Sequence, residues 1–181
     1  MESESVDAMV TGPARATRAA SFDDFYRAQF PRLVPLARAL CGSASADDTA
    51  QEAMLAAYRN WRRVGEMASP EAWVRRTCAN LAVSVFRRRV NEAKALVRLG
   101  RTVDIPPLSA DDEAFWAAVR TLPKRQAQSA ALRYLYNLSL AEIAETLDIS
   151  EGSVKVHLSR ARTALVMHLG LDAGHGSEEE R

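Results

Sequence analysis

The clearest pattern of apolar and polar positions in the chain lies between Leu138 and Arg162. In its first part, apolar residues recur at i, i+3, i+4 and i+7, which is the spacing of one face of an α-helix. These residues are Leu140, Ile143, Ala144 and Leu147. Ser139 and Glu142 have the spacing of a capping box, so the sequence predicts a defined start for this helix.

A second helix is predicted after a break at residues 148–150, because Ser150 is a suitable N-cap residue. Its apolar face consists of Val154, Leu158, Ala161 and Leu165. Its other sides carry Ser153, Lys155, Val156, His157, Ser159, Arg160 and Arg162. Two short helices with a tight turn, the second bearing small, polar and basic residues outside, are typical of a DNA-binding helix-turn-helix. Taken alone, this stretch also fits an αα-hairpin in a helical bundle.

The remaining apolar positions also follow helical spacing, and clear alternation of β-branched residues is missing. We therefore expect an all-α fold, with further helices over residues 21–41, 46–61, 70–89, 111–122 and 123–136. Pro35 falls inside the first of them and should kink or shift it. The spacing places Ala50, Met54, Ala57, Tyr58 and Trp61 on the buried side of the second helix, and Trp73, Val74, Thr77, Leu81 and Val85 on that of the third.

Residues 96–110 contain two consecutive prolines, and we expect them to form an extended, flexible linker. This linker divides the chain into a helical module over 21–95 and a helix-turn-helix module over 111–169. Residues 1–20 are rich in Ala, Ser and Thr, and they are expected to form a disordered extension. Residues 170–181 are Gly-rich and then acidic, and they are expected to form a flexible tail.

The formal net charge of +1 conceals an uneven distribution of charge. Residues 59–101 carry 11 basic and 3 acidic side chains, whereas residues 1–58 carry 5 basic and 8 acidic ones. A nearly neutral chain with a strongly basic middle indicates a local site for a polyanion. Trp61 and Trp73 flank the loop before the basic helix, an arrangement that can hold phosphates while bases stack. A solvated arginine-rich surface helix is the alternative.

The composition disfavours several other classes of protein. Hydrophobic residues make up 48% of the chain, which is too much for a disordered protein. Cys41, Cys78 and the three histidines lack metal-ligand spacing, so no metal or cofactor is expected. We find no paired carboxylates near a basic groove and no Gly-rich phosphate loop, so no catalytic residues are expected. A signal peptide and a membrane-spanning run are also missing, which predicts a cytoplasmic protein without membrane insertion.

Taken together, the segments resemble the sigma factors of bacterial RNA polymerase, specifically the minimal two-domain extracytoplasmic-function (ECF) type of the sigma-70 family. The matching segments are Phe25-Tyr26 through Leu40, Asp48-Thr49-Ala50-Gln51-Glu52-Ala53, Pro70 through Asn80, and Leu122-Pro123 to Arg162. Their order and spacing carry the resemblance, because no single motif is decisive. Gln128-Ser129 departs from the family pattern by interrupting a usually apolar stretch. The resemblance implies a non-enzymatic initiation factor that melts the minus-ten element and reads the minus-thirty-five element of promoter DNA.

The resemblance also implies a set of functional residues. The minus-thirty-five contacts would be Arg133, Ser153, Lys155, Val156, Ser159, Arg160 and Arg162, with Arg160 the best candidate for a bidentate guanine contact. The minus-ten contacts would be Trp61, Arg62, Arg63, Trp73, Arg75, Arg76, Asn80, Arg87 and Arg88. Core polymerase would bind Asp48, Gln51 and Glu52 through its beta-prime clamp helices, and it would bind the second module through its beta flap. An anti-sigma factor is a further partner that the resemblance allows.

A stand-alone helix-turn-helix regulator is the competing hypothesis. Such a regulator should carry a receiver or ligand-binding domain with strands, a phosphoacceptor Asp or an apolar pocket. Residues 21–95 offer helices and an arginine cluster instead. A helical adaptor is a further alternative, but it does not explain the concentration of positive charge.

Overall fold

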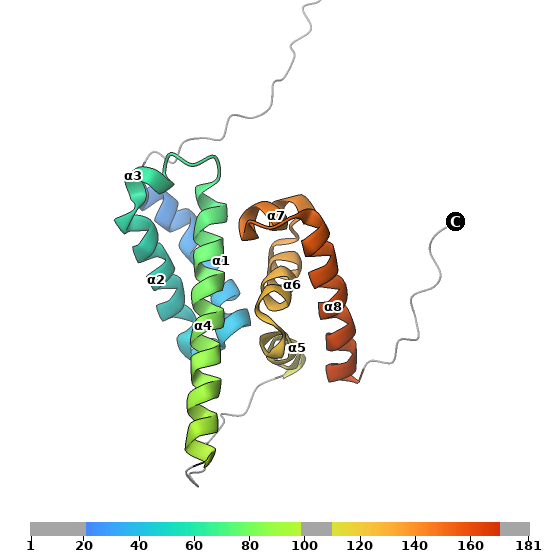
Figure 1. Cartoon of the computed structure of the whole chain (residues 1–181). Coiled ribbons are helices and arrows are strands. Elements are labelled where there is room, and N and C mark those ends of the chain that lie inside the picture. The colour runs from blue at the N-terminus through green and yellow to red at the C-terminus, as the bar shows by residue number, and fades with distance from the viewer. Residues whose placement is uncertain (1–20, 99–109, 171–181) are drawn as a thin grey trace, which may run out of the picture.

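The structure is a computed structural model that describes residues 21–98 and 110–170. Within these ranges all regular structure is helical, which confirms the predicted class (Figure 1). The helices are α1 (Phe22–Cys41), α2 (Ala46–Arg59), α3 (Trp61–Val64), α4 (Pro70–Arg98), α5 (Ala110–Thr121), α6 (Lys124–Tyr136), α7 (Leu140–Leu147) and α8 (Glu151–Leu169), with a 3-10 turn η1 (Ser43–Ser45) before α2. The extension, the centre of the linker and most of the predicted tail lie outside the described residues.

Helix α1 begins where the sequence predicted, because the Ser21 side chain accepts a hydrogen bond from the backbone N–H of Asp24. The helix continues without a break through Pro31 and Pro35 to Cys41. Pro35 cannot donate to the carbonyl of Pro31, which is four residues earlier. Both prolines are exposed, so water can satisfy that carbonyl, and the helix passes through Pro35, where the sequence predicts a kink or a shift.

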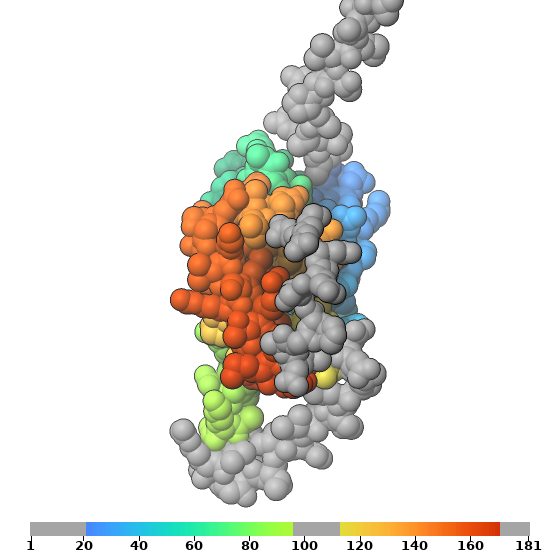
Figure 2. All heavy atoms as spheres, turned by 90° about the vertical axis from the view of Figure 1, so that its right-hand side faces the viewer, coloured from blue at the N-terminus to red at the C-terminus, as the bar shows by residue number. Residues whose placement is uncertain are grey.

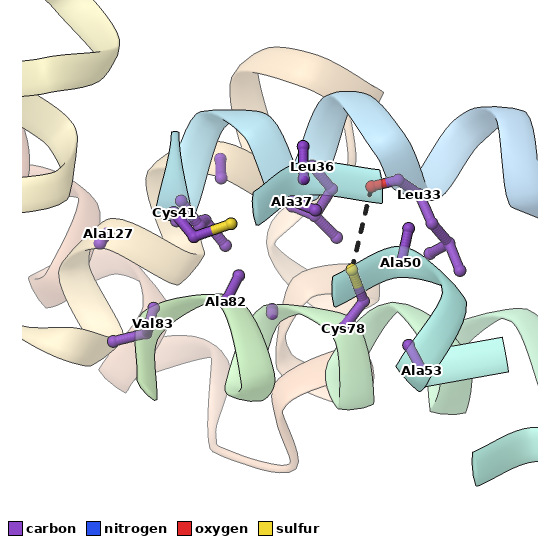
Figure 3. Packing of buried hydrophobic residues seen from close by; sticks show 14 of the residues in the cluster. Leu33, Leu36, Ala37, Cys41, Ala50, Ala53, Cys78, Ala82, Val83 and Ala127 are labelled. Carbon is purple, nitrogen blue, oxygen red and sulfur yellow. Dashed lines mark hydrogen bonds between the residues drawn. The ribbon is translucent and has the colours of Figure 1, made fainter. Parts of the chain in front are cut away.

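Helices α1, α2 and α4 pack together as the first module. The predicted inward face of α4 is only partly correct, since Val74 is buried but Trp73 and Leu81 are half-buried. The fully buried positions of α4 are largely small, and they include Cys78, Ala79 and Ala82. Small side chains let the helix axes approach closely. Figure 3 shows Cys78 and Ala82 facing residues of α1 and α2 within one hydrophobic cluster.

The second module contains the predicted helix-turn-helix. The capping box is complete, because the Ser139 hydroxyl accepts the N–H of Glu142 while the Glu142 carboxylate accepts the N–H of Ser139. The latter bond holds the pKa of the Glu142 carboxyl below its usual value. Asp148 ends α7 in the left-handed conformation at φ 55°, and Ser150 caps α8 as predicted. A small core joins the two helices to α6; it consists of Leu132, Ile143, Ala144, Leu147 and Val154.

The two modules share one continuous hydrophobic core, which the sequence did not predict. Helix α1 contacts α5 and α6, and α4 contacts α7. Buried residues of the second module, such as Val119, Ala127 and Ala130, belong to the same cluster as Leu36 and Val83 of the first. Figure 2 shows the second module lying against the first, with the far end of α4 projecting beyond it.

The two cysteines are buried in this core, and we expect both to be unreactive in the folded protein. Burial raises the pKa of the Cys78 thiol to about 12, and its sulfur lies 3.8 Å from the Leu33 carbonyl oxygen (Figure 3). Burial also raises the pKa of Cys41, against a hydrogen bond with Thr49 that lowers it. Because the thiolate is the reactive form, a disulfide reagent at about pH 8 should modify both thiols only after denaturation. Rapid modification of either thiol in the native protein would contradict this expectation.

Candidate nucleic-acid interface

The outer face of α8 presents the predicted minus-thirty-five residues to solvent. Helix α8 buries Val154, Ala161 and Leu165, which turns the opposite face outward. The exposed residues on that face include Lys155, Val156, Ser159, Arg160 and Arg162. None of the ion pairs in the described part of the chain involves Arg160 or Lys155. A rigid helix with unpaired basic and polar side chains is suited to entering the major groove.

Two predicted contacts on this side already have structural partners. The Arg133 guanidinium donates to the Leu138 carbonyl at 2.7 Å and so ties the end of α6 to the start of α7. The Ser153 backbone N–H donates to the Ser150 hydroxyl, and the two hydroxyl oxygens are 2.9 Å apart. The first contact joins α6 to the segment before α7, and the second caps the start of α8. A direct role of Arg133 and Ser153 on DNA stays a prediction.

His157, which is absent from the predicted set, lies half-buried on α8 beside this face. Burial lowers the pKa of its imidazole, and the charges of Arg125 and Arg160 lower it further. The ring is therefore neutral at neutral pH and adds no charge to the reading surface. The spacing of apolar residues could not indicate that His157 is half-buried. Its surroundings include Arg125 of α6, a helix that precedes the helix-turn-helix in the chain.

The predicted minus-ten residues on α3 and α4 do not form one continuous patch. Arg62, Arg63, Arg87 and Arg88 are exposed, as a phosphate contact requires. Positions 75 and 88 are separated by roughly 20 Å along α4, at about 1.5 Å per residue. The basic helix can therefore follow several nucleotides of a strand, while no single base can contact both ends.

Trp61 and Trp73 are packed against the core, although the resemblance assigns them to the minus-ten set. The Trp61 ring lies 5.3 Å from the Phe22 ring centroid and 5.0 Å from that of Phe25. Both tryptophans are half-buried and pack against the main hydrophobic cluster. In this structure they support the loop between α3 and α4, and a direct contact with bases stays a prediction.

Other predicted minus-ten residues are held by the second module. Both terminal nitrogens of the Arg76 guanidinium lie 3.2 Å from one carboxylate oxygen of Asp148, in the turn of the helix-turn-helix. The Asn80 side-chain carbonyl accepts a hydrogen bond of 3.0 Å from the amide of Gln128. Gln128 is fully buried, so the polar residue that interrupts the apolar stretch of α6 has a specific partner on α4.

Arg75 also faces the second module, where its guanidinium carbon lies 5.3 Å from the ring centroid of Tyr136. This distance is within the range of a cation–π interaction. The Tyr136 hydroxyl in turn donates to the Arg32 carbonyl on α1 at 2.5 Å. Burial raises the pKa of the Tyr136 phenol well above its ordinary value, so the phenol remains a hydrogen-bond donor.

A further contact joins the modules at the end of α1. The buried Arg120 guanidinium donates to the carbonyls of Arg38 and Ala39, both at 3.3 Å. These carbonyls belong to the last turn of α1, where the helix dipole favours a cation, and the Arg38 carbonyl also accepts the backbone N–H of Gly42. Glu113 pairs with Arg120 at 2.5 Å and compensates its charge.

The predicted polymerase-binding residues Asp48, Gln51 and Glu52 are exposed on α2 and line an open groove of about 610 Å³ between α1 and α2. The rest of the groove is largely apolar; its lining includes Phe22, Tyr26, Met54, Leu55 and Tyr58. Tyr58 is 61% exposed and Leu55 is 44% exposed, whereas the sequence placed Tyr58 on the buried side of this helix. The groove combines an acidic rim with apolar walls, which suits a basic amphipathic helix.

Two classes of feature are missing from the described residues. No group of three His, Cys, Asp or Glu side chains in 21–98 and 110–170 could hold a metal ion. Over the same part of the chain, no helix combines the length and the apolar character that crossing a membrane would require.

Comparison with known proteins identifies both modules. Residues 25–92 match the family Sigma-70 region 2, and residues 112–165 match the family Sigma-70, region 4. The chain is 30% identical over 154 residues to the ECF RNA polymerase sigma factor SigM of Mycobacterium tuberculosis, covering 83% of this chain and 78% of SigM. It is also 30% identical over 156 residues to the RNA polymerase sigma-E factor of Streptomyces antibioticus, covering 83% of each chain.

Solved structures agree on the fold. The sigma factor RpoE of Bartonella quintana, in complex with the anti-sigma factor NepR, superposes with a TM-score of 0.64 at 23% identity, covering 83% of this chain and 98% of RpoE. CnrH, in complex with the cytosolic domain of CnrY, gives a TM-score of 0.58 at 20% identity and covers 84% of this chain and 89% of CnrH. A stand-alone regulator would not contain region 2. The chain therefore belongs to the ECF sigma factors of the sigma-70 family, non-enzymatic proteins that direct RNA polymerase to promoters.

Proposed function

We propose that the two modules divide promoter recognition between the minus-thirty-five and minus-ten elements. Helix α8 inserts its exposed face into the major groove of the minus-thirty-five element, with Arg160 and Lys155 as its principal contacts. The arginines of α3 and α4 hold the melted strand of the minus-ten element through its phosphates. The observation that carries this proposal is the α8 face, which is basic, exposed and opposite a buried apolar stripe.

Core polymerase docks on the groove between α1 and α2 in this proposal. The carboxylates of Asp48 and Glu52 lie at the groove, and the exposed Leu55 and Tyr58 offer apolar anchors. A basic amphipathic helix complements both features, and we assign this role to the beta-prime clamp helices. The second module is assigned to the beta flap. The complex acts in the cytoplasm, where transcription takes place.

An anti-sigma factor is a further proposed partner. RpoE and CnrH, which share this fold, were each solved with a second protein, named as an anti-sigma factor in the case of NepR. Purification of a tagged chain from its native cells should recover core polymerase together with any such inhibitor. Recovery of core polymerase alone, under inducing and non-inducing conditions, would contradict this part of the proposal.

Run-off transcription with purified core polymerase tests the proposed promoter function. Genomic fragments are pooled as templates, and transcripts are sequenced with and without the full-length chain. We expect a set of start sites that depends on the added protein and shares two conserved blocks upstream. Start sites that share only the downstream block would overturn the role assigned to α8.

Glu52→Lys is expected to weaken binding to core polymerase without destabilising the fold. The side chain is exposed, so its replacement should change the free energy of unfolding by less than about 0.5 kcal/mol. Charge reversal places a cation against a basic partner and should raise the dissociation constant roughly tenfold or more. Fluorescence anisotropy of the labelled chain measures this constant. Glu92→Lys on α4 is the matched control, because Glu92 is also exposed and belongs to the same module but lies outside the groove.

A further inference from the structure

Basic side chains of α4 and α6 gather at one place, where these two helices lie side by side (Figure 1). The hydrogen bond of 3.0 Å between Asn80 and Gln128 fixes how the helices face each other. Arg87 lies two turns beyond Asn80 on α4, on the same face. Lys124 lies one turn before Gln128 on α6, again on the same face. The helical spacing therefore brings Arg87 toward the start of α6.

The charges gathered there are not compensated within the described residues. The pKa of the Lys124 ammonium is lowered first by burial and then by nearby guanidinium groups, namely those of Arg125, Arg87 and Arg76. Arg76 is paired with Asp148. None of the ion pairs within 21–98 and 110–170 involves Arg87, Lys124 or Arg125. Like charges held together without a counter-charge repel one another, and an anion placed among them would relieve that repulsion.

The start of α6 adds main-chain donors to this cluster of cations. Helix α6 begins at Lys124, and its N-cap residue Pro123 makes no side-chain cap bond. The N–H groups of a first helical turn lack helical acceptors, and the helix dipole makes their surroundings positive. The Arg125 guanidinium donates to the neutral Gln128 side-chain oxygen at 3.2 Å, which holds it in place without cancelling its charge. An anion beside Lys124 therefore meets main-chain and side-chain donors together.

We propose that Arg87, Lys124 and Arg125 form a binding site for a compact polyphosphate anion, either inorganic polyphosphate or the phosphate chain of a nucleotide. Guanidinium groups donate two parallel hydrogen bonds to phosphate oxygens, and the lysine adds a point charge. Three cations from two helices suit several linked phosphates better than one. Duplex DNA does not fit between α4 and α6, because the two helices share a hydrogen bond only one turn along α6.

Occupation of this site affects promoter opening, a consequence that rests on the proposed division of promoter recognition. Arg87 is one of the predicted minus-ten contacts. A bound polyphosphate and the phosphates of the melted strand therefore compete for the same guanidinium group. Promoter opening should decrease as the concentration of the polyphosphate rises.

Isothermal titration calorimetry of the full chain with tripolyphosphate, at fixed ionic strength, tests the site. We expect the parent chain to bind tripolyphosphate at one site and at least about tenfold more tightly than orthophosphate. The double substitution Lys124→Gln/Arg125→Gln keeps helix-forming polar side chains and should weaken binding about tenfold or more. The matched control Arg27→Gln/Arg59→Gln removes the same net charge from exposed positions on α1 and α2. It should stay within about twofold of the parent chain.

Arg87→Gln is a second variant should the double variant fail to fold, which circular dichroism would show. Arg87 is exposed, so glutamine is tolerated there, and the loss of one cation should weaken tripolyphosphate binding about fivefold. Unchanged affinity in this variant would confine binding to α6 and overturn a site shared by the two modules. Equal losses in the site variants and in the control would show attraction by net charge alone, which also overturns the proposal.

Two further ligands distinguish the source of the phosphates. Equal affinities for magnesium-free ATP and tripolyphosphate would support a site for the phosphate chain alone, whereas tighter binding of ATP would support a nucleotide. If the double variant lost affinity for a single-stranded oligothymidylate 12-mer but kept it for tripolyphosphate, nucleic acid would be the ligand and the proposal would be wrong. These titrations involve no transcription, so a failure of run-off transcription would overturn the proposed promoter function without deciding this site.

Discussion

Leu147→Ala is expected to reduce the free energy of unfolding by about 2–5 kcal/mol and to melt the helix-turn-helix. The Leu147 side chain is fully buried in the small cluster beneath the turn. Its neighbours in the cluster are held in place by α6, α7 and α8, so they can refill the cavity only in part. A loss of this size is a large share of the stability of a small domain, which is typically about 5–15 kcal/mol. Urea denaturation followed by circular dichroism measures the change.

Leu140→Ala is the matched control for this substitution. Leu140 lies on the same helix α7, but it is only half-buried and packs at the edge of the cluster. Its replacement should cost clearly less than that of Leu147. If both variants lost the same stability, the cluster beneath the turn would not be the element that holds α7 against α8.

Local signals explain why the helix-turn-helix could be predicted closely. Ser139, Glu142 and Ser150 interact with backbone groups within three residues, so their roles are fixed by nearby sequence. Asn137 and Asp148 adopt positive φ values of 51° and 55° where the helical pattern ends. Asparagine and aspartate tolerate this left-handed conformation, and Asp148 lies in the predicted break at residues 148–150.

The buried face of α4 was harder to predict because hydrophobic spacing favours large residues. Leu81 and Val85 were placed inward, whereas the structure buries Cys78, Ala79 and Ala82 more completely. Close packing of α1, α2 and α4 selects small side chains at the contact. The small residues Cys78, Ala79 and Ala82 on one side of this long helix were the sequence signal that could have identified its buried face.

The packing of the two modules had only one sequence signal. Gln128-Ser129 interrupts an apolar stretch, and such a polar residue inside a helix face indicates a buried hydrogen-bond partner. That partner, Asn80, lies 48 positions earlier and on a different module. Periodicity describes only neighbours along one helix, so it could not reveal which surface would cover Gln128. For the same reason, the half-burial of Arg75 and Arg76 could not be predicted.

Arg160→Ala is expected to weaken promoter selection at one base pair of the minus-thirty-five element while leaving the fold intact. The side chain is exposed, and the change in unfolding free energy should stay within about 0.5 kcal/mol. A bidentate arginine–guanine contact contributes about 1–3 kcal/mol of discrimination, which corresponds to roughly 5- to 150-fold in relative promoter use. Competitive run-off transcription over templates mutated singly across the element measures this ratio.

Lys155→Ala separates base reading from phosphate binding on the same helix. Lys155 is also exposed, but a lysine acts on phosphate as a point charge without a fixed geometry. Its replacement should weaken all templates equally and reduce the salt dependence of binding by about one counterion. If Arg160→Ala gave the same uniform loss, its contact would be with phosphate. The guanidinium that points outward from α8 would then position the helix on DNA, and base selection would have to come from Val156 and Ser159, the other exposed residues of that face.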